Sequence, residues 1–302
     1  MKHFVNLSAL LVFLAASTAC SSDDPSADSD DDSNNLDDSM DPPATFENPE
    51  SALWNAAEDS YFVSNVAGES DAADGVGWIA KLDSEGEPVD ARWVKGLNAP
   101  KGMALSGDNL YVADLTELLE IDGATGEILN RVAIPGAVFL NDVTASEDTV
   151  WISDTFAGAI FSYTPSTEKV EELAMDPALA SINGLAFDGT NIIGGTIGDF
   201  TDPTDLGNFL SISLSGEVTV LASEVGKFDG IVARDGASFL ATDFRGMLLT
   251  VDADGTTTVL KDLTKDFAMM SAADLGYDPV RNQVAIPDLF ASTVVFIDLG
   301  DD

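Results

Sequence analysis

Polar side chains recur along this chain at intervals that a repeat fold would bring together. Each stands before a short run of alternating apolar residues that ends in a polar turn, as Asn183 stands before Leu185, Phe187 and the Asp188-Gly189 turn. The six positions are Glu50, Lys101, Asn141, Asn183, Asp229 and Asp274. They are separated by 51, 40, 42, 46 and 45 residues, and periods of this size are typical of propellers and solenoids.

The chemistry that such a set favours is the binding of a hard cation. Carboxylates and amide oxygens are the ligands that Ca²⁺ prefers. Asn-Gly and Asp-Gly pairs are also common turn formers, so one such position alone would more often be a turn than a ligand. Their shared phase favours the site, because all six fall at one point of the repeat.

Strands must position these residues, and three or four can be recognised in each repeat. Second strands such as 110–114 follow the first ones, third strands such as 118–121 follow those, and a fourth is recognisable in five of the six units. The sixth unit ends at Leu299 without room for a fourth strand. We expect residues 44–47 to supply it, which would join the first blade to the last and remove an exposed edge.

The sequence therefore predicts an all-β domain over residues 46–302, a six-bladed β-propeller of four-stranded blades closed by strand exchange between its N- and C-termini. In propellers the first strand of each blade lines the central channel, so the six polar residues would meet at one mouth of that channel. Four aspartates after second strands fit either an outer ring around this mouth or turns whose amides they satisfy: Asp114, Asp154, Asp243 and Asp288.

The N-terminus has the features of a secretory signal. A short basic head precedes the apolar run 4–16, which is too short to span a bilayer as a helix. The segment from Ser17 to Cys20 resembles a bacterial lipobox, in which the cysteine is acylated; ordinary cleavage after Ala19 is the alternative. The lipoprotein is favoured because Cys20 is the only cysteine. We therefore expect a signal peptide over 1–19, an acylated, disordered acidic tether over 20–45, and an outer-membrane lipoprotein facing the periplasm or the exterior.

Composition excludes several classes of function. The chain has 53 acidic and 13 basic residues and a formal charge of −40, so nucleic acids and anionic lipid headgroups are poor partners. We expect a monomer that meets the membrane only through its N-terminal lipid. The only histidine, His3, leaves with the signal peptide, which excludes a Ser-His-Asp or Cys-His nucleophile and any histidine-ligated metal.

Residues 46–299 resemble the senescence marker protein/gluconolactonase/luciferin-regenerating enzyme family of six-bladed propellers. Glu50 with Trp54 is similar to the family's Glu-Gly-Pro-x-Trp opening, although Ser and Ala replace the Gly and Pro. Asn141 begins a segment similar to its Asn-Asp-Gly motif, with Val143 in place of Gly. The segments 182–185 and 228–231 match its Asn-Gly-Leu and Asp-Gly-Met/Ile motifs.

The resemblance implies a catalytic cation, Ca²⁺ or another divalent ion, at one site in the channel mouth. Glu50, Asn183 and Asp229 would coordinate it, and Asp229 would also serve as the general base. Asn141 would contact metal or substrate, Lys101 would take the place of the family's basic substrate-binding residue, and we expect Asp274 on the substrate-binding side.

Two functions of different classes remain open. The first is a calcium-dependent hydrolase of a lactone or a similar ester at the cell envelope. The second is a non-catalytic propeller that binds a protein, a peptide or a sugar at its mouth, as related-looking NHL-type and strictosidine-synthase-like propellers suggest. Fold alone does not decide between them.

Overall fold

The computed structural model describes residues 45–234 and 238–300. The chain divides into two units, Met1–Asp41 and Pro42–Asp302, and the description covers only the second. The predicted signal peptide, the acylation of Cys20 and most of the acidic tether lie outside the described residues. Among the residues that are described, no helix is long and apolar enough to cross a membrane.

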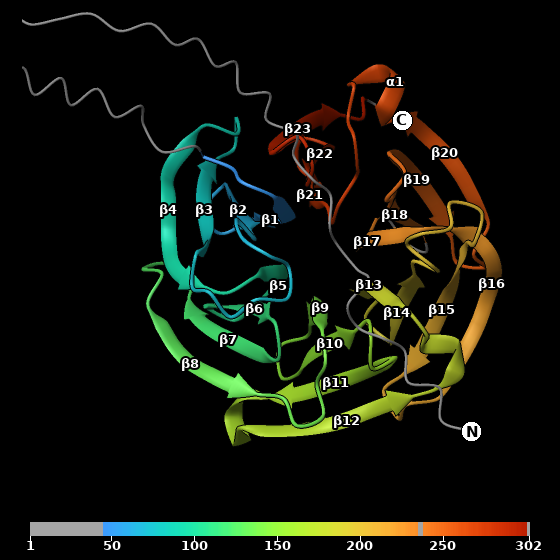
Figure 1. Cartoon of the computed structure of the whole chain (residues 1–302), viewed down its shortest axis with the longest axis horizontal. Coiled ribbons are helices and arrows are strands. Elements are labelled where there is room, and N and C mark those ends of the chain that lie inside the picture. Colours follow the sequence, from blue (N-terminus) through green and yellow to red (C-terminus); the bar gives the residue numbers. More distant parts are fainter. Residues whose placement is uncertain (1–44, 235–237, 301–302) are drawn as a thin grey trace, which may run out of the picture. The chain divides into compact units, whose positions relative to one another are not determined.

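The described strands form six antiparallel sheets that follow one another around a ring (Figure 1). Blade 1 contains β1 (Pro49–Asn55), β2 (Ser60–Asn65), β3 (Gly77–Asp83) and β4 (Pro88–Leu97). Blade 2 contains β5 (Pro100–Ser106), β6 (Asn109–Asp114), β7 (Glu117–Asp122) and β8 (Ile128–Ala133). Blade 3 contains β9 (Leu140–Ala145), β10 (Val150–Asp154), β11 (Ala159–Thr164) and β12 (Lys169–Met175).

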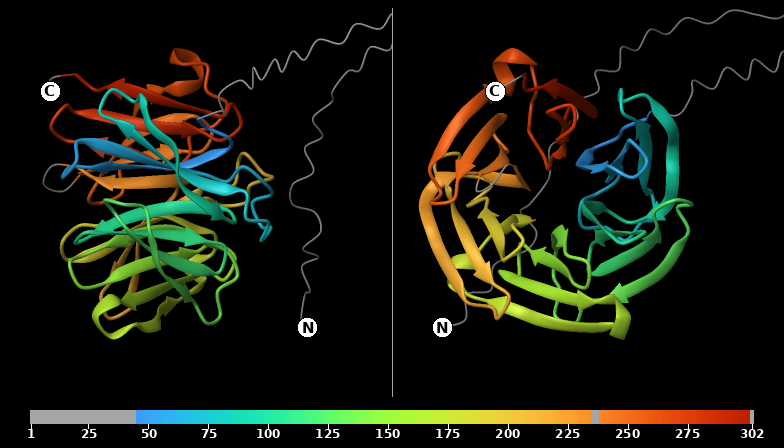
Figure 2. Two further views of the ribbon diagram at one scale, coloured as in Figure 1. Left: turned by 90° about the vertical axis from the view of Figure 1, so that its left-hand side faces the viewer. Right: turned by 180° about the vertical axis from the view of Figure 1, so that it is seen from behind.

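The second half of the ring repeats this order (Figure 2). Blade 4 contains β13 (Ile182–Phe187), β14 (Asn191–Thr196), β15 (Gly207–Ser213) and β16 (Val218–Gly226). Blade 5 contains β17 (Phe228–Ala233), β18 (Ser238–Asp243), β19 (Met247–Asp252) and β20 (Thr257–Asp262), followed by the single-turn helix α1 (Leu263–Asp266). Blade 6 contains β21 (Gly276–Asp278), β22 (Gln283–Asp288) and β23 (Thr293–Asp298). The predicted six-bladed propeller is confirmed.

Apolar cores lie between consecutive blades. Residues of blade 2 such as Tyr111 pack with residues of blade 3 such as Ile152 and Phe161, all of them 2% exposed or less. The second strand of each blade is the most enclosed, and every residue of β2 and β10 is buried. The outer strands alternate, as β8 does between half-buried and exposed residues, because one of their faces meets solvent. The inner strands are therefore enclosed between the apolar cores of neighbouring blades.

Buried aspartates at the ends of second strands fix the entry of the chain into the first strands. Asp154, which is fully buried, accepts hydrogen bonds from the backbone N–H groups of Val138 (2.6 Å), Phe139 (3.1 Å) and Ala157 (2.8 Å). Asp114, Asp243 and Asp288 receive equivalent bonds in their own blades. These aspartates therefore satisfy turn amides and do not form an outer ligand ring.

Closure of the ring differs from the predicted exchange strand. The described residues of blade 6 form three strands, and residues 45–48 do not pair as a fourth. Asn48 instead donates from its backbone N to Ser292 Oγ (3.1 Å) and from Nδ2 to Leu289 O (3.0 Å). The carbonyl oxygens of Glu47 and Asn48 accept from the backbone N–H groups of Ala67 (3.2 Å) and Val66 (3.1 Å), so this segment runs beside the end of β2 in blade 1.

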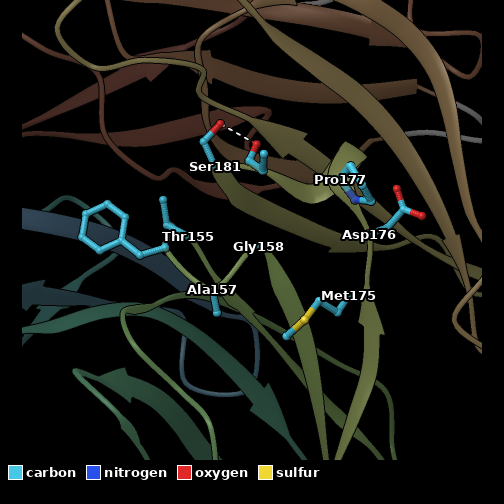
Figure 3. A pocket seen from close by; sticks show the side chains of 9 residues that line it. Thr155, Ala157, Gly158, Met175, Asp176, Pro177 and Ser181 are labelled. Carbon is cyan, nitrogen blue, oxygen red and sulfur yellow. Dashed lines mark hydrogen bonds between the residues drawn. The ribbon is translucent and has the colours of Figure 1, made fainter. Parts of the chain in front are cut away.

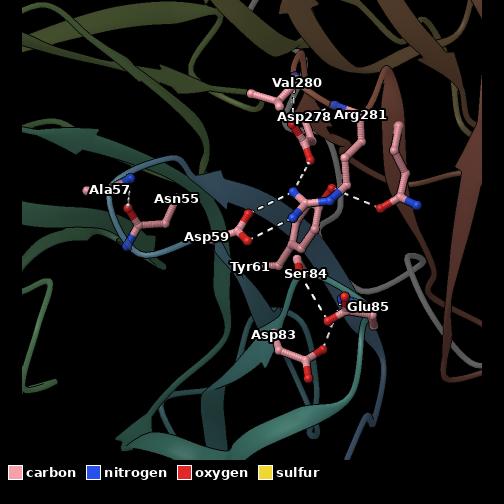
Figure 4. Close-up of polar contacts among 11 residues, drawn as sticks. Asn55, Ala57, Asp59, Tyr61, Asp83, Ser84, Glu85, Asp278, Val280 and Arg281 are labelled. Atoms are coloured by element: carbon pink, nitrogen blue, oxygen red, sulfur yellow. Dashed lines mark hydrogen bonds and ion pairs between the residues drawn. The ribbon is translucent and has the colours of Figure 1, made fainter.

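Arg281 joins blades 6 and 1 at the far end of β1 (Figure 4). Its guanidinium donates to both carboxylate oxygens of Asp59, each at 2.7 Å, and to Asp278 Oδ2 at 2.7 Å. Asp278 is fully buried, whereas Asp59 is exposed. A bidentate bond of this kind fixes the relative orientation of two carboxylates and a guanidinium.

We expect Arg281→Met to lower the midpoint of thermal unfolding, because the buried carboxylate of Asp278 loses its counter-ion at the junction of the first and last blades. The loss should shrink as salt rises, since the Asp59 pair is screened. Lys169→Met is the matched control, because Lys169 pairs with Glu171 at 2.8 Å on the exposed face of a single strand, β12. Circular dichroism at low and high salt measures the midpoint of thermal unfolding. Equal losses in the two variants would contradict a special role of this junction.

Candidate functional site

The predicted polar residues stand on a backbone irregularity shared by five blades. In blade 3, Leu140 pairs with Asp154 and Val143 pairs with Ile152, so Asn141 and Asp142 together oppose the single residue Ser153. The same two-against-one register occurs in β1, β5, β13 and β17. Two residues opposing one is a β-bulge, a feature that re-aims side chains and is frequent beside active sites. The first bulge residues are Glu50, Lys101, Asn141, Asn183 and Asp229.

Asp274 precedes β21 of blade 6 and corresponds to Asp142, the second bulge residue of blade 3, and not to Asn141 as the predicted ring requires. Asp142 Oδ1 accepts from the next backbone N–H at 2.7 Å, and Asp274 Oδ1 does the same at 2.8 Å. A Cβ on Gly102 would meet Asp142 Oδ1, and one on Gly230 would meet Asp274 Oδ1, each at 2.3 Å. The two aspartates are therefore equivalent, and glycines beside them leave room for their carboxylates.

Glu50, Asn183 and Asp229 bring oxygen atoms together at the mouth. The Asn183 side chain hydrogen-bonds to Asp229, and the negative charge of Asp229 acts on Glu50. All three residues are at most 9% exposed. Glu50 Oε2 is buried and has no hydrogen-bond partner among the described residues. A buried carboxylate oxygen without a donor is costly, and a cation would offset that cost, so these residues fit a divalent ion.

The pKa values of the buried carboxyl groups in the channel also favour a cation site. Burial, followed by the charge of Asp229, raises the pKa of Glu50 well above its ordinary value. Burial, followed by the charge of Asp274, raises the pKa of Asp229 to about 8 and that of Asp142 well above its usual range. Burial also raises the pKa of Asp274 to about 7. Among these four buried carboxyl groups, Glu50 alone interacts with the ammonium of Lys101, and this excess of acidic groups favours the binding of a cation.

The amide of Asn141 has a defined orientation. Thr155 Oγ1 donates its only proton to Ile182 O (2.8 Å), so it must accept the 3.0 Å bond from Asn141 Nδ2. The carbonyl oxygen Oδ1 of Asn141 is then the atom turned away from Thr155. Asn141 can therefore contribute an oxygen to a cation or a hydrogen-bond acceptor to a substrate, as predicted.

Two buried lysines fasten the long loops beside the mouth. Lys101 Nζ donates to Ser70 O and Ala99 O, both at 3.1 Å, and Lys227 Nζ donates to Asp199 O and Asp205 O, both at 2.7 Å. The first lysine fixes the β2–β3 loop of blade 1, and the second fixes the β14–β15 loop of blade 4. Two of the three protons of Lys101 are thus already engaged. A substrate-binding role of Lys101 stays a prediction. A substrate bound there would have to share the Lys101 ammonium with the β2–β3 loop.

Sequence reasoning missed three residues of this region. The sequence patterns assign no role to Asp142, Thr155 or Lys227, although each is at most 4% exposed. Asp142 carried a usable signal, because it is charged where the corresponding residues of three other blades are glycine: Gly102, Gly184 and Gly230. Below Asp142 and Asp274 the channel continues as a cavity of about 330 Å³ that they share with apolar side chains such as Val143 and Leu275. The two carboxylates separate the polar mouth from this apolar part.

Asp229→Asn should stabilise the cation-free protein at high pH. The folded protein raises the pKa of Asp229 from 3.8 to about 8, so the unfolded chain releases this proton at lower pH than the folded chain does. The contribution to stability is complete below the unfolded pKa and declines as pH rises from about 4 to about 8. Removing the charge should therefore increase the free energy of unfolding at about pH 9 by at least about 1 kcal/mol, and by less at about pH 5.

Urea unfolding in the presence of a chelator measures this difference. Glu172→Gln, on the exposed face of β12, is the matched control and should show no such pH-dependent gain. A loss of stability in Asp229→Asn at both pH values would contradict the assignment of a destabilising buried charge.

Comparison with known proteins gives the class of fold. No protein-family model and no curated protein matches the chain. Among solved structures it is similar to a gluconolactonase from Xanthomonas campestris (TM-score 0.61, 16% identity, 81% of this chain and 84% of the other). It is also similar to a putative gluconolactonase (TM-score 0.60, 18% identity, 84% and 88%). A streptogramin B lyase gives a TM-score of 0.56 at 12% identity, over 83% of this chain and 93% of the lyase.

These likenesses define a six-bladed β-propeller. Gluconolactonase propellers stand among its structural neighbours, in agreement with the resemblance inferred from the sequence motifs. At such identities the likeness establishes the fold, and the activity depends on the chemistry of the site itself.

Proposed function

We propose that the protein is a divalent-cation-dependent hydrolase that cleaves a lactone or a similar ester. The observation that carries this proposal is the unpartnered, buried Glu50 Oε2 beside Asn183 and Asp229. Glu50, Asn183 and Asp229 would hold the cation, Ca²⁺ by the chemistry of its ligands. When bound, the cation would act as a Lewis acid on the ester carbonyl. The gluconolactonases among the structural neighbours support the same class of reaction.

The residues of the mouth divide the remaining work among them. Asp229, with a free lone pair after its bond from Asn183, would accept a proton from the attacking water as general base. Asn141 would orient the substrate or the cation through Oδ1, since its amide group is fixed by Thr155. The fixed loops beside the mouth would limit the access of bulk water. No histidine is needed for this chemistry.

The proposal places this activity at the cell envelope through acylation of Cys20. Mass spectrometry of the protein from membranes of the native host would detect a lipid-modified N-terminal cysteine. An unmodified N-terminus after Ala19 would favour a secreted protein instead.

A hydrolysis assay tests the proposed reaction. Chelator-treated protein should be inactive against a panel of γ-lactones, δ-lactones and short esters, and added Ca²⁺ should restore the activity. The rate should be followed by proton release in weak buffer. Activity that survives complete removal of divalent cations would overturn this mechanism, and inactivity against the whole panel would favour a binding propeller.

A further inference from the structure

A second concave region opens beside the mouth, between blades 3 and 4 (Figure 3). Its volume is about 380 Å³. The turn after β10 forms one side, and the connection from β12 to β13, with the 3-10 helix η3 (Pro177–Leu179), forms the other. The lining residues are Thr155, Phe156, Ala157, Gly158, Met175, Asp176, Pro177, Ala180 and Ser181. We call this region the blade 3–4 pocket.

The blade 3–4 pocket shares a wall with the candidate cation site. Thr155 lines the pocket and accepts the hydrogen bond from Asn141 Nδ2. Thr155 also donates to Ile182 O, and Ile182 directly precedes the predicted ligand Asn183. A molecule held at the mouth by Asn141 would therefore lie next to the pocket.

The surface of the pocket is mainly apolar, and Ser181 and one carboxylate oxygen of Asp176 are already engaged in hydrogen bonds. Ser181 Oγ donates its only proton to Ala180 O (2.6 Å) and accepts a hydrogen bond from Gly198 N (3.0 Å). Asp176 Oδ1 accepts from Ala178 N (2.8 Å), and Figure 3 shows this carboxylate directed away from Thr155. A polyhydroxylated ligand would find few partners here, and burying its hydroxyl groups would cost free energy.

Apolar side chains are exposed at this pocket and continue toward the mouth. Met175 is 59% exposed and Phe156 is 45% exposed. The Phe156 ring lies 4.6 Å from the ring of Phe139, centroid to centroid. The centroid of the Phe139 ring in turn lies 4.3 Å from Nζ of Lys101, which is one of the first bulge residues. The rings of Phe156 and Phe139 therefore lie between the pocket and Lys101 at the mouth, and their burial by a ligand would be favourable.

We propose that the blade 3–4 pocket binds the apolar substituent of the substrate, so that the preferred substrates are lactones or esters with an alkyl or aryl group and not polyhydroxylated sugar lactones. This inference rests on the proposed hydrolase function and names its substrate class. Phe156 and Met175 provide the surface that the substituent covers. Ala180 lines the pocket, so a larger side chain there would occupy part of its volume.

A chain-length series tests this specificity. The holoprotein, loaded with Ca²⁺, is assayed with γ-lactones whose alkyl substituent grows from none to six carbons, and with glucono-δ-lactone. Each buried methylene should raise kcat/KM about two- to fourfold over the first carbons. In Ala180→Phe the ratio of kcat/KM for the longest to the unsubstituted lactone should fall at least about tenfold. Ala180 has a φ of −55°, which Phe adopts without strain.

The control is Val259→Phe, which adds a ring at an exposed position of β20 in blade 5 and should keep the wild-type ratio. Hydrolysis without a dependence on chain length, a preference for glucono-δ-lactone, or an unchanged ratio in Ala180→Phe would each overturn the inference while the hydrolase function stands.

If no lactone is hydrolysed, the proposed hydrolase function is wrong. A binding measurement then tests whether the blade 3–4 pocket takes an apolar substituent. Calorimetric titration with the corresponding alkyl lactams should give an affinity that rises with chain length in the wild type and is flat in Ala180→Phe. An affinity that is flat in both proteins would overturn the inference.

Discussion

Glu50→Gln should abolish cation-dependent hydrolysis and weaken the binding of Ca²⁺ by at least about 100-fold. The substitution keeps the size of the side chain but removes the charge of the one buried mouth carboxylate whose Oε2 has no donor among the described residues. An amide supplies a single weaker oxygen ligand, and its nitrogen repels a cation. Calorimetric titration of Ca²⁺ into chelator-stripped protein measures the affinity, and the lactone assay measures the rate.

Folding does not explain this expected loss. Burial raises the pKa of Glu50, so its neutral replacement should leave the cation-free protein at least as stable as the wild type. Glu172→Gln, an equal chemical change on an exposed face, should bind Ca²⁺ and hydrolyse lactones as the wild type does. Wild-type affinity in Glu50→Gln would show that Glu50 is not a ligand.

Asp154→Ala should have the largest effect on stability, a loss of about 2–4 kcal/mol. Removing this fully buried carboxylate leaves the N–H groups of Val138, Phe139 and Ala157 without their acceptor at the entry to β9. Because β9 carries Asn141, cation affinity should also fall. Chemical unfolding with and without Ca²⁺ measures both effects.

The control for this prediction is Asp188→Ala, which removes an aspartate that accepts from two N–H groups in an exposed hairpin turn. Its loss should be much smaller, because water can replace an exposed acceptor. Comparable losses in the two variants would contradict the structural role assigned to the buried aspartates.

The six blades could be predicted because their signals are local and repeated. Apolar alternation identified first and second strands such as β13 and β10, and the polar residue at each strand start fixed the phase of the repeat. Five of the six predicted mouth residues therefore fall at equivalent positions. The prediction was most secure where several copies of one pattern agreed.

Features that depend on register or on distant contacts could not be predicted in this way. Asp274 was placed in the ring with Asn141, yet it is equivalent to Asp142, since a bulge shifts the register by one residue without any sign in hydrophobic periodicity. Lys227 binds carbonyl groups about 20 to 30 residues earlier in the chain, a contact that only the folded loops create. The closure at Asn48 depends likewise on loops at the far end of the chain.

The most direct test of a cation at the mouth is anomalous diffraction from crystals grown with Ca²⁺ or soaked in Mn²⁺. We predict one anomalous peak per chain in the channel mouth, about 2.0 to 2.6 Å from oxygen atoms of Glu50, Asn183 and Asp229. A peak at another place, or no peak at saturating cation, would contradict the central claim and leave the propeller without the metal centre on which its proposed chemistry depends.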